Sequence, residues 1–496
     1  MYYRHFLPPT QIRPGWGILS AMDQSPPEAE TRTPPGLSAR QAALGILSQW
    51  RPGPLRHARS VEDLLDQQAL PARERGLLHE LVLGVVRHWL PLKHLLVVIS
   101  GRKWKDIHPR LQPILLLGAY QLIWLDGIPP FAAVSEAVGQ AKREAGPPAG
   151  RFVNAVLRQL VRQIEHRRIE PARCDPARAI PVDLSACCQF RTAVLPDPAH
   201  QPIEHLALAT SHPVWLVARW ASSFGLDTAR QVCLAGMCRP AMILRPNPLR
   251  TNLFRLADSL RAEGIETQPD ESTGALVVVS HAVQLTRTAA FAAGLFQVQD
   301  RTAMDVVQAM NPQPGQTIVD LCAGPGTKTT QMAEMTKDRG RILASDKDDE
   351  RLAPVRENCG RLGLTAIQTV PPWERETVFG SLERIDWILV DAPCSNTGVL
   401  ARRPEARYRA SRQSLRSLNA LQIELLAEAD RFAGPHTRLA YSTCSLETEE
   451  NEGLAARFAQ EHPRWRLTAS RRTFPQAGPD PGQWFDGGFW AIWQRA

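Results

Sequence analysis

The hydrophobic positions in the first third of the chain repeat with the period of an α-helix. Apolar residues recur three and four positions apart in residues 77–89, and residues 111–125 are almost wholly apolar. The first pattern predicts a helix with one buried face, and the second predicts a central helix. Residues 131–144 and 150–165 continue the helical spacing, without the alternation of a strand. We therefore predict an all-helical bundle of residues 37–168.

The helical pattern ends after the bundle. Residues 169–202 are rich in proline, which is typical of a linker. Residues 203–293 hold a helical stretch at 213–224, and then an apolar run, a second helical stretch and a second apolar run. This order of elements predicts a small α+β domain. At the other end of the chain, residues 1–36 are proline-rich and lack an apolar core, so we expect a disordered tail.

Residues 294–496 alternate short apolar runs with longer amphipathic stretches. This alternation predicts a parallel sheet covered by helices, the α/β Rossmann-like architecture. The runs that predict buried strands are residues 317–321, 341–345, 366–370, 385–390 and 438–441. Ligands bind at the carboxyl ends of the strands in such a sheet, so candidate chemistry is expected just after each run.

Length and cysteine usage narrow the class of protein. A chain of 496 residues is too long for one core, so several domains are expected. The nine cysteines are scattered, which favours a reducing cytoplasm over a secreted disulfide framework. Cys187-Cys188 lacks a second pair at the spacing of metal ligands, so no metal site is predicted. No apolar run reaches the ~20 residues of a membrane span, so no membrane partner is expected.

The positive charge is concentrated in the predicted bundle. The net charge is +8, and residues 37–170 hold 19 Lys and Arg against 11 Asp and Glu. Such a local excess favours a polyanionic partner, although a solvated helical face also explains it. Further arginines could hold phosphates or form a plain exposed loop: Arg402, Arg403, Arg407, Arg409 and Arg412.

Two cysteines stand at neighbouring strand ends in the α/β region. Cys394 follows the fourth predicted strand, with Asp391 beside it, and Cys444 follows the fifth. Two strands joined by one crossover helix are usually neighbours in the sheet, so both thiols should face one cleft. The alternative is that each cysteine simply packs in a core.

A glycine-rich turn follows the first predicted strand. Residues 322–328 read Cys-Ala-Gly-Pro-Gly-Thr-Lys, and glycines at such a turn let the backbone approach a ligand closely. Asp346 ends the second strand, where a carboxylate can accept both hydroxyl protons of a ribose. The turn lacks the spacing of the dinucleotide fingerprint and of the P-loop, so nicotinamide and ATP are disfavoured.

Residues 320–330, 391–399 and 441–451 resemble the motifs of RNA cytosine-5 methyltransferases. The order of domains is similar to that of the bacterial 16S rRNA methyltransferases of the Sun/Fmu type, over residues 37–495. The resemblance implies an RNA-binding NusB-like bundle, a small RNA-positioning subdomain and a Rossmann-like catalytic domain. It also implies S-adenosylmethionine as cofactor and RNA, expected to be 16S rRNA, as partner of a monomeric cytoplasmic enzyme.

The resemblance also implies roles for individual residues. Cys444 would be the nucleophile, Cys394 would assist release of the product, Asp391 would hydrogen-bond the base, and Lys328 would orient the base or favour the thiolate. The residues implied in cofactor binding are Cys322, Ala323, Gly324, Pro325, Gly326, Thr327, Lys328, Asp346 and Asp391.

Three positions depart from the family pattern. Thr327 replaces a glycine, Arg403 replaces a histidine, and Pro371-Pro372 stands where an acid usually follows the third strand. These departures keep a second hypothesis open, an RNA-binding ribosome-assembly factor with the same fold and weak or no turnover. A NusB-like transcription factor would explain only the first domain.

Overall fold

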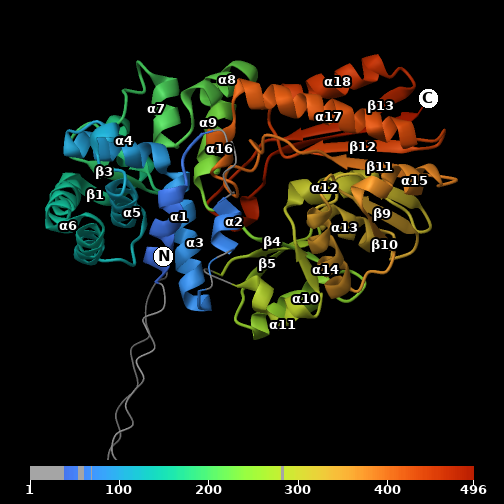
Figure 1. Ribbon diagram of the computed structural model, residues 1–496, viewed down its shortest axis with the longest axis horizontal. Coiled ribbons are helices and arrows are strands. Elements are labelled where there is room, and N and C mark those ends of the chain that lie inside the picture. Colours follow the sequence, from blue (N-terminus) through green and yellow to red (C-terminus); the bar gives the residue numbers. More distant parts are fainter. Residues whose placement is uncertain (1–37, 54–60, 67, 69, 281–283, 496) are drawn as a thin grey trace, which may run out of the picture.

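The computed structural model describes residues 38–53, 61–66, 68, 70–280 and 284–495. The expected disordered tail, residues 1–36, lies outside the described residues. A helical bundle occupies one side of the molecule and a seven-stranded sheet the other, with a smaller sheet below them (Figure 1). The predicted combination of a helical, an α+β and a Rossmann-like part is therefore confirmed.

The bundle is built around one helix, α5. Almost every residue of α5 is buried, as its continuous apolar run predicts. The last bundle helix, α6, joins the two predicted helices across a kink at Ala145 and Gly146, just before Pro147 and Pro148. The bundle helices are α1 (Ala39–Gln49), α2 (Val61–Asp66), α3 (Ala72–Arg87), α4 (Trp89–Ser100), α5 (Leu111–Trp124) and α6 (Pro130–Gln163).

The prediction of an all-helical bundle is wrong at its end, after residue 163, and the prediction of a linker at residues 169–202 is wrong for part of that stretch. Strands β1 (Ile164–Ile169), β2 (Ala179–Pro181) and β3 (Cys187–Phe190) form an antiparallel sheet in the order β1-β3-β2. Ile180, Cys188 and Phe190 are buried against the bundle core. Strands of three to six residues between prolines carry too short an alternation to be recognised in the sequence.

The described middle of the chain combines helices with a four-stranded antiparallel sheet. The sheet has the order β5-β6-β4-β7, with β5 (Thr267–Asp270), β6 (Ala275–Val278), β4 (Ile243–Pro246) and β7 (Phe296–Val298). The helices that precede the sheet in the sequence are α7 (Pro202–Ala209), α8 (Val214–Phe224) and α9 (Leu226–Met237). The helices that connect its strands are α10 (Leu253–Ala262) and α11 (Ala289–Ala292).

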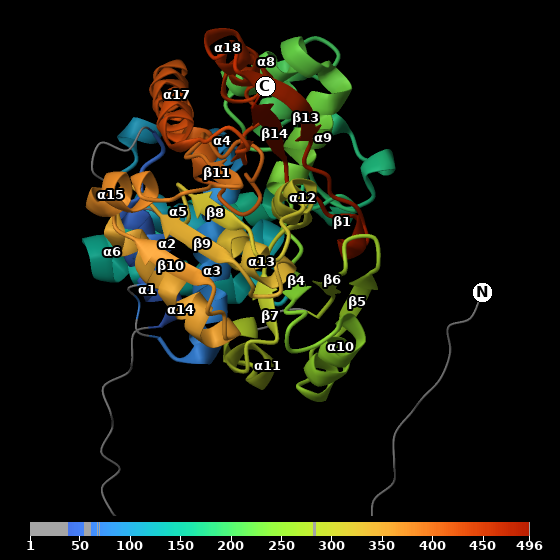
Figure 2. The same ribbon diagram turned by 90° about the vertical axis from the view of Figure 1, so that its right-hand side faces the viewer.

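The large sheet has the order β10-β9-β8-β11-β12-β14-β13. Figure 2 shows its strands β10, β9, β8 and β11 following one another. Its parallel strands correspond to the predicted runs: β8 (Thr317–Asp320), β9 (Arg341–Ser345), β10 (Ile367–Val370), β11 (Trp387–Asp391) and β12 (Arg438–Thr443). Two antiparallel strands were not predicted, β13 (Trp465–Thr473) and β14 (Gly488–Arg495). The pairing of β11 with β12 places Asp391 opposite Ser442.

Helices cover the large sheet and connect its strands. They are α12 (Arg301–Met310), α13 (Thr327–Met335), α14 (Ala353–Leu362), α15 (Arg375–Gly380), α16 (Ala406–Arg409), α17 (Arg412–Phe432) and α18 (Glu452–Glu461). Across the described parts of the chain, no single helix is long and apolar enough to cross a membrane. Helices α3 and α4 would reach that length and hydropathy only as a pair bent by 74°.

Candidate active site

The two cysteines predicted to share a cleft are in contact. Cys394 lies in the loop after β11 and Cys444 directly follows β12, and their Sγ atoms are 3.2 Å apart. Both side chains are half-buried. The hydrogen bond with Cys444, followed by burial and the negative charge of Glu450, raises the pKa of Cys394 well above its usual range. Cys394 is therefore held as a neutral thiol that can donate to Cys444.

Asn396 contacts both cysteines, and the sequence analysis did not single it out. Its Oδ1 accepts a hydrogen bond from the Cys444 thiol at 3.1 Å, and its Nδ2 donates to the Cys394 carbonyl at 3.0 Å. Its φ of 60° lies in the left-handed region, which asparagine tolerates better than most residues. An asparagine in a loop gives no signal in the sequence for such a role.

Lys328 and Asp391 form an ion pair beside the thiols. The Nζ of Lys328 is 2.7 Å from Oδ2 of Asp391, and Ser442 donates to Oδ1 of Asp391 at 2.6 Å. Burial lowers the pKa of Lys328, but Asp391 and then Cys444 raise it, and the net shift is upward. Lys328 therefore stays positively charged close to Cys444, where a cation favours a thiolate.

The glycine turn between β8 and α13 is closely packed. A Cβ at Gly324 would lie 2.8 Å from the carbonyl oxygen of Arg351, and Gly326 has a φ of 100°. Only glycine fits both requirements without a shift of the backbone. Helix α13 begins at Thr327 without a hydrogen bond from a side-chain cap, so its first N–H groups are available to a ligand.

The other residues of this turn are also placed together. The amide of Asn358 donates to the Pro325 carbonyl at 3.2 Å, and Ala323 is buried. Burial, with Asp320 and Asp346 nearby, raises the pKa of Cys322 well above its usual range, so this third thiol of the region stays protonated. The turn thus presents backbone groups rather than reactive side chains.

Asp346 directly follows β9, at the strand end where it was predicted, and already has protein partners. The amide of Gly324 donates to its Oδ2, and Arg351 pairs with its Oδ1, both at 3.1 Å. The carboxylate is almost fully buried, whereas the Arg351 side chain is 44% exposed. Arg351 therefore covers the carboxylate from the solvent side.

The end of β10 carries Pro371, Pro372 and Trp373, and the Trp373 side chain is 71% exposed. Arg375, two residues further, is buried beneath the strand ends. It donates to Ser345 Oγ at 2.7 Å and to the Leu321 carbonyl at 2.9 Å, and it pairs with Glu428 at 3.1 Å.

The hypothesis that arginines after Cys394 hold phosphates is wrong for two of them. Arg407 is fully buried and donates to four carbonyls, those of Thr210, Ser211, Gly236 and Leu400. Arg402 pairs with Asp300 and Asp486. These two side chains tie the loop to neighbouring elements instead of facing a ligand.

Comparison with known proteins identifies the family. The model of the 16S rRNA methyltransferase RsmB/F matches residues 307–482, that of the NusB family residues 37–162, and that of the RsmF/B-like ferredoxin-like domain residues 212–286. The chain is 31% identical over 410 residues to the probable ribosomal RNA small subunit methyltransferase B of Bacillus subtilis (strain 168), with 81% of this chain and 84% of that protein covered. The chain belongs to the RsmB/F family of 16S rRNA methyltransferases.

Other matches agree with membership of the RsmB/F family. A probable ribosomal RNA small subunit methyltransferase B of Synechocystis is 32% identical over 445 residues, covering 89% of this chain and 93% of that protein. The crystal structure of PH0851 has the same fold, with a TM-score of 0.69 at 21% identity, over 92% of this chain and 98% of that one. The NusB match covers only the first domain, so a NusB-like transcription factor does not account for the whole chain.

As a member of this family, the protein is an S-adenosylmethionine-dependent methyltransferase. The residues present fit the cofactor. The turn at Gly324 and Gly326 and the uncapped start of α13 offer backbone donors, and Asp346 lies at the next strand end. At the end of β10, prolines stand at the two positions after the strand, and the exposed side chains that follow are Trp373 and Glu374.

Proposed function

We propose that this protein transfers a methyl group to carbon 5 of a cytosine in 16S rRNA through a covalent cysteine adduct. The observation that carries the proposal is the contact of Cys394 and Cys444 beside the Lys328–Asp391 ion pair. Two thiols of unequal environment, with a fixed cation and a carboxylate, match the needs of nucleophilic addition followed by elimination.

Cys444 acts as the nucleophile in this proposal. Its thiolate, favoured by Lys328, forms a bond to carbon 6 of the cytosine, and the electrons of the C5=C6 bond become available at carbon 5. When bound, S-adenosylmethionine would supply the methyl group to carbon 5 by breaking its methyl–sulfur bond, and would leave as S-adenosylhomocysteine. Asp391 accepts a hydrogen bond from the amino group of the base and orients the ring, and one-third of its side chain is exposed toward solvent.

Release of the product reverses the addition. A base removes the proton from carbon 5, the C5=C6 double bond forms again, and the bond from carbon 6 to Cys444 breaks. The Cys394 thiol lies 3.2 Å from the departing sulfur, and its hydrogen bond stabilises the thiolate that leaves. The two cysteines therefore have different tasks although they touch.

The proposed cofactor contacts are those of the glycine turn and of the next strand end. Backbone groups of residues 322–328 surround the methionine part, and Asp346 accepts from the ribose hydroxyls once Arg351 has moved aside. The basic bundle holds the RNA, and the target base leaves its stack to reach Cys444. We expect a monomer that works in the cytoplasm.

An adduct-trapping experiment tests the proposal. In the variant Cys394→Ala, addition proceeds but release is slowed, so an RNA–protein adduct should accumulate on denaturing gels. The double variant Cys394→Ala/Cys444→Ala should show no adduct. Cys359→Ala, at another half-buried cysteine of the same domain, is the control and should behave as the wild type. An adduct that persists without Cys444 would remove this cysteine as the nucleophile.

A second candidate function is ribosome assembly without turnover. It is favoured by the absence of an acid from residues 371–373 and by the ion pair that covers Asp346. Calorimetric titration with S-adenosylmethionine separates the two functions, since the assembly factor predicts no binding up to millimolar cofactor. Bisulfite mapping of 16S rRNA from cells that lack the protein would then identify the target base.

A further inference from the structure

A buried carboxylate, Glu450, lies between the two cysteine loops. It ends the short helix η7 (Thr448–Glu450), and its side chain is fully buried. Its Oε1 accepts from the backbone N–H of Ser395 at 3.0 Å and from Nε2 of Gln422 at 2.9 Å. Its Oε2 accepts from the hydroxyls of Ser395 and Ser445, both at 2.5 Å.

These partners are the residues next to the reactive thiols. Ser395 directly follows Cys394, and Ser445 directly follows Cys444, so one carboxylate accepts hydrogen bonds from both loops. Gln422 of α17 also donates to the Pro393 carbonyl at 2.9 Å, on the other side of Cys394. Glu450 therefore links the carboxyl ends of β11 and β12 at the position where the thiols meet.

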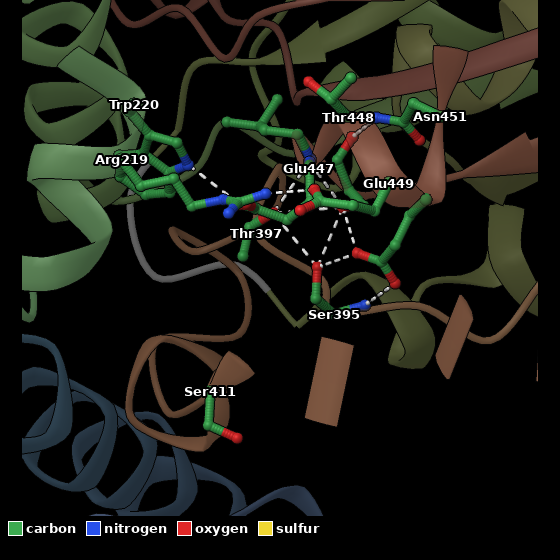
Figure 3. Close-up of polar contacts among 12 residues, drawn as sticks. Arg219, Trp220, Ser395, Thr397, Ser411, Glu447, Thr448, Glu449 and Asn451 are labelled. Carbon is green, nitrogen blue, oxygen red and sulfur yellow. Dashed lines mark hydrogen bonds and ion pairs between the residues drawn. The ribbon is translucent and has the colours of Figure 1, made fainter. Parts of the chain in front are cut away.

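The network extends to helix α8 of the middle region (Figure 3). The backbone N–H of Glu447 donates to the Ser445 hydroxyl at 2.9 Å. The carboxylate of Glu447 accepts from Trp220 Nε1 at 3.0 Å and pairs with Arg219 at 2.5 Å. The cysteine loops are thus also fastened to the domain that precedes them in the chain.

A carboxylate buried at this position lowers the stability of the fold. Burial raises the pKa of Glu450, although its hydrogen bonds to Ser395, Ser445 and Gln422 lower it. Burial of a charge lowers stability, and neutral side chains could join two loops with a smaller loss of stability. The charge also acts on Cys394, whose proton it helps to retain.

We propose that Glu450 is the positioning residue of the thiol pair, which fixes the loops of Cys394 and Cys444 at the contact that the cysteine chemistry requires. This inference rests on the proposed function, because only the proposed cysteine chemistry requires the two thiols to be in contact. The contact itself can be tested without RNA or cofactor.

Cross-linking of the two thiols measures their positioning. Diamide oxidises a pair of neighbouring thiols to a disulfide and is itself reduced to the hydrazine, and peptide mass spectrometry identifies the Cys394–Cys444 cross-link. Glu450→Ala removes every bond of the carboxylate, so the half-time of cross-linking should rise at least about tenfold. Glu449→Ala is the matched control, because Glu449 is adjacent but half-exposed, and it should cross-link like the wild type.

Glu450→Gln separates the charge from the hydrogen bonds. Its amide can still accept from the Ser395 backbone, and the two serine hydroxyls can accept from its NH₂ group, so cross-linking should stay within about twofold of the wild type. The titratable groups that face Cys394 are Cys444, Tyr441 and Glu450. Loss of the Glu450 charge should shift the pH profile of Cys394 alkylation, measured in a Cys444→Ala background, to lower pH.

These outcomes distinguish the inference from the proposed function. Unchanged cross-linking in a folded Glu450→Ala variant would overturn the positioning role. If Glu450→Ala does not fold, Ser445→Ala decides, because it removes the hydrogen bond from the Cys444 loop to the carboxylate, and unchanged cross-linking in it overturns the role. A wild-type protein that cross-links as expected but never forms an RNA adduct would instead contradict the proposed methyl transfer and leave the positioning result standing.

Discussion

At the scale of single residues, the buried carboxyl of Asp320 makes stability depend on pH. Burial raises the pKa of Asp320 to about 7, although Thr329 donates to it at 2.7 Å. The pKa of Asp320 is higher in the folded than in the unfolded protein. Its protonated carboxyl therefore contributes fully to the free energy of unfolding below about pH 4, and this contribution is lost as the pH rises through 7. Between pH 5.5 and pH 8, the free energy of unfolding of the wild type, measured with urea, should fall by about 2 kcal/mol more than that of Asp320→Asn.

An exposed acid provides the control for this pH effect. Asp348→Asn changes a carboxyl on the turn after β9, keeps its cap to the Glu350 amide, and should follow the wild type at both pH values. Equal pH dependence of the wild type and Asp320→Asn would contradict the prediction, because the difference between their curves isolates this one carboxyl.

Residues differ in how far the sequence reveals their place. The contact of Cys394 and Cys444 could be predicted, because strand adjacency follows from one crossover helix. Asn396 could not, because its role depends on a left-handed turn and a partner 48 residues away. Arg407 was misjudged, since a sequence does not show whether an arginine is exposed or fully buried.

At the scale of elements, one ion pair joins the small sheet to the cofactor turn. Arg245 of β4 pairs with Glu334 of α13 through two bonds of 2.8 and 2.9 Å, and it donates to the Thr327 carbonyl at 2.9 Å. Arg245→Met leaves the buried Glu334 without its partner and should cost about 3–5 kcal/mol. The double variant Arg245→Met/Glu334→Met should recover most of this loss in urea unfolding.

A surface ion pair is the control for Arg245. Arg261 and Asp258 are both exposed on α10, so Arg261→Met should change stability by less than about 1 kcal/mol. A double variant as unstable as Arg245→Met alone would show that the loss comes from the other acceptors of Arg245, in Gln299, Thr327 and Thr330, and not from the unpaired carboxylate.

Elements were predictable where burial gave them a pattern. Four of the parallel strands, β8, β9, β11 and β12, are mostly buried, so they stand out as apolar runs, whereas β10 buries only Val370. Strand β13 is exposed over most of its length and reads as a polar, basic stretch, so it was missed. Strands β1, β2 and β3 are short and lie among prolines, and only their contact with the bundle core makes them regular.

At the scale of the whole molecule, the loop after Cys394 is anchored to the helical bundle. Arg87 of α3 donates to the Ala401 carbonyl at 2.8 Å, and Arg239 pairs with Glu80 at 2.5 Å across the same region. The ring of Tyr408 packs edge-on against Trp50, with 5.8 Å between the ring centroids. The domain expected to hold RNA and the loop that carries a reactive thiol therefore share one buried interface.

Removal of the Tyr408 hydroxyl would test whether this interface holds the loop after Cys394 in place. The hydroxyl donates to the Val86 carbonyl at 3.0 Å and bonds the Ser211 hydroxyl at 2.8 Å, and burial raises its pKa to about 12, so it remains a donor. Tyr408→Phe removes these two hydrogen bonds, although Ser211 still accepts from the Leu90 N–H at 3.0 Å, so the free energy of unfolding should fall by about 1–2 kcal/mol. Amide exchange of residues 401–409 should accelerate about tenfold, while the centre of α5 exchanges as before. Arg416→Ala, at an exposed position of α17, should change neither. Faster exchange throughout the bundle would mean that Tyr408 stabilises the bundle itself, whereas unchanged exchange of the loop would show that Arg87 and Arg407 suffice to anchor it.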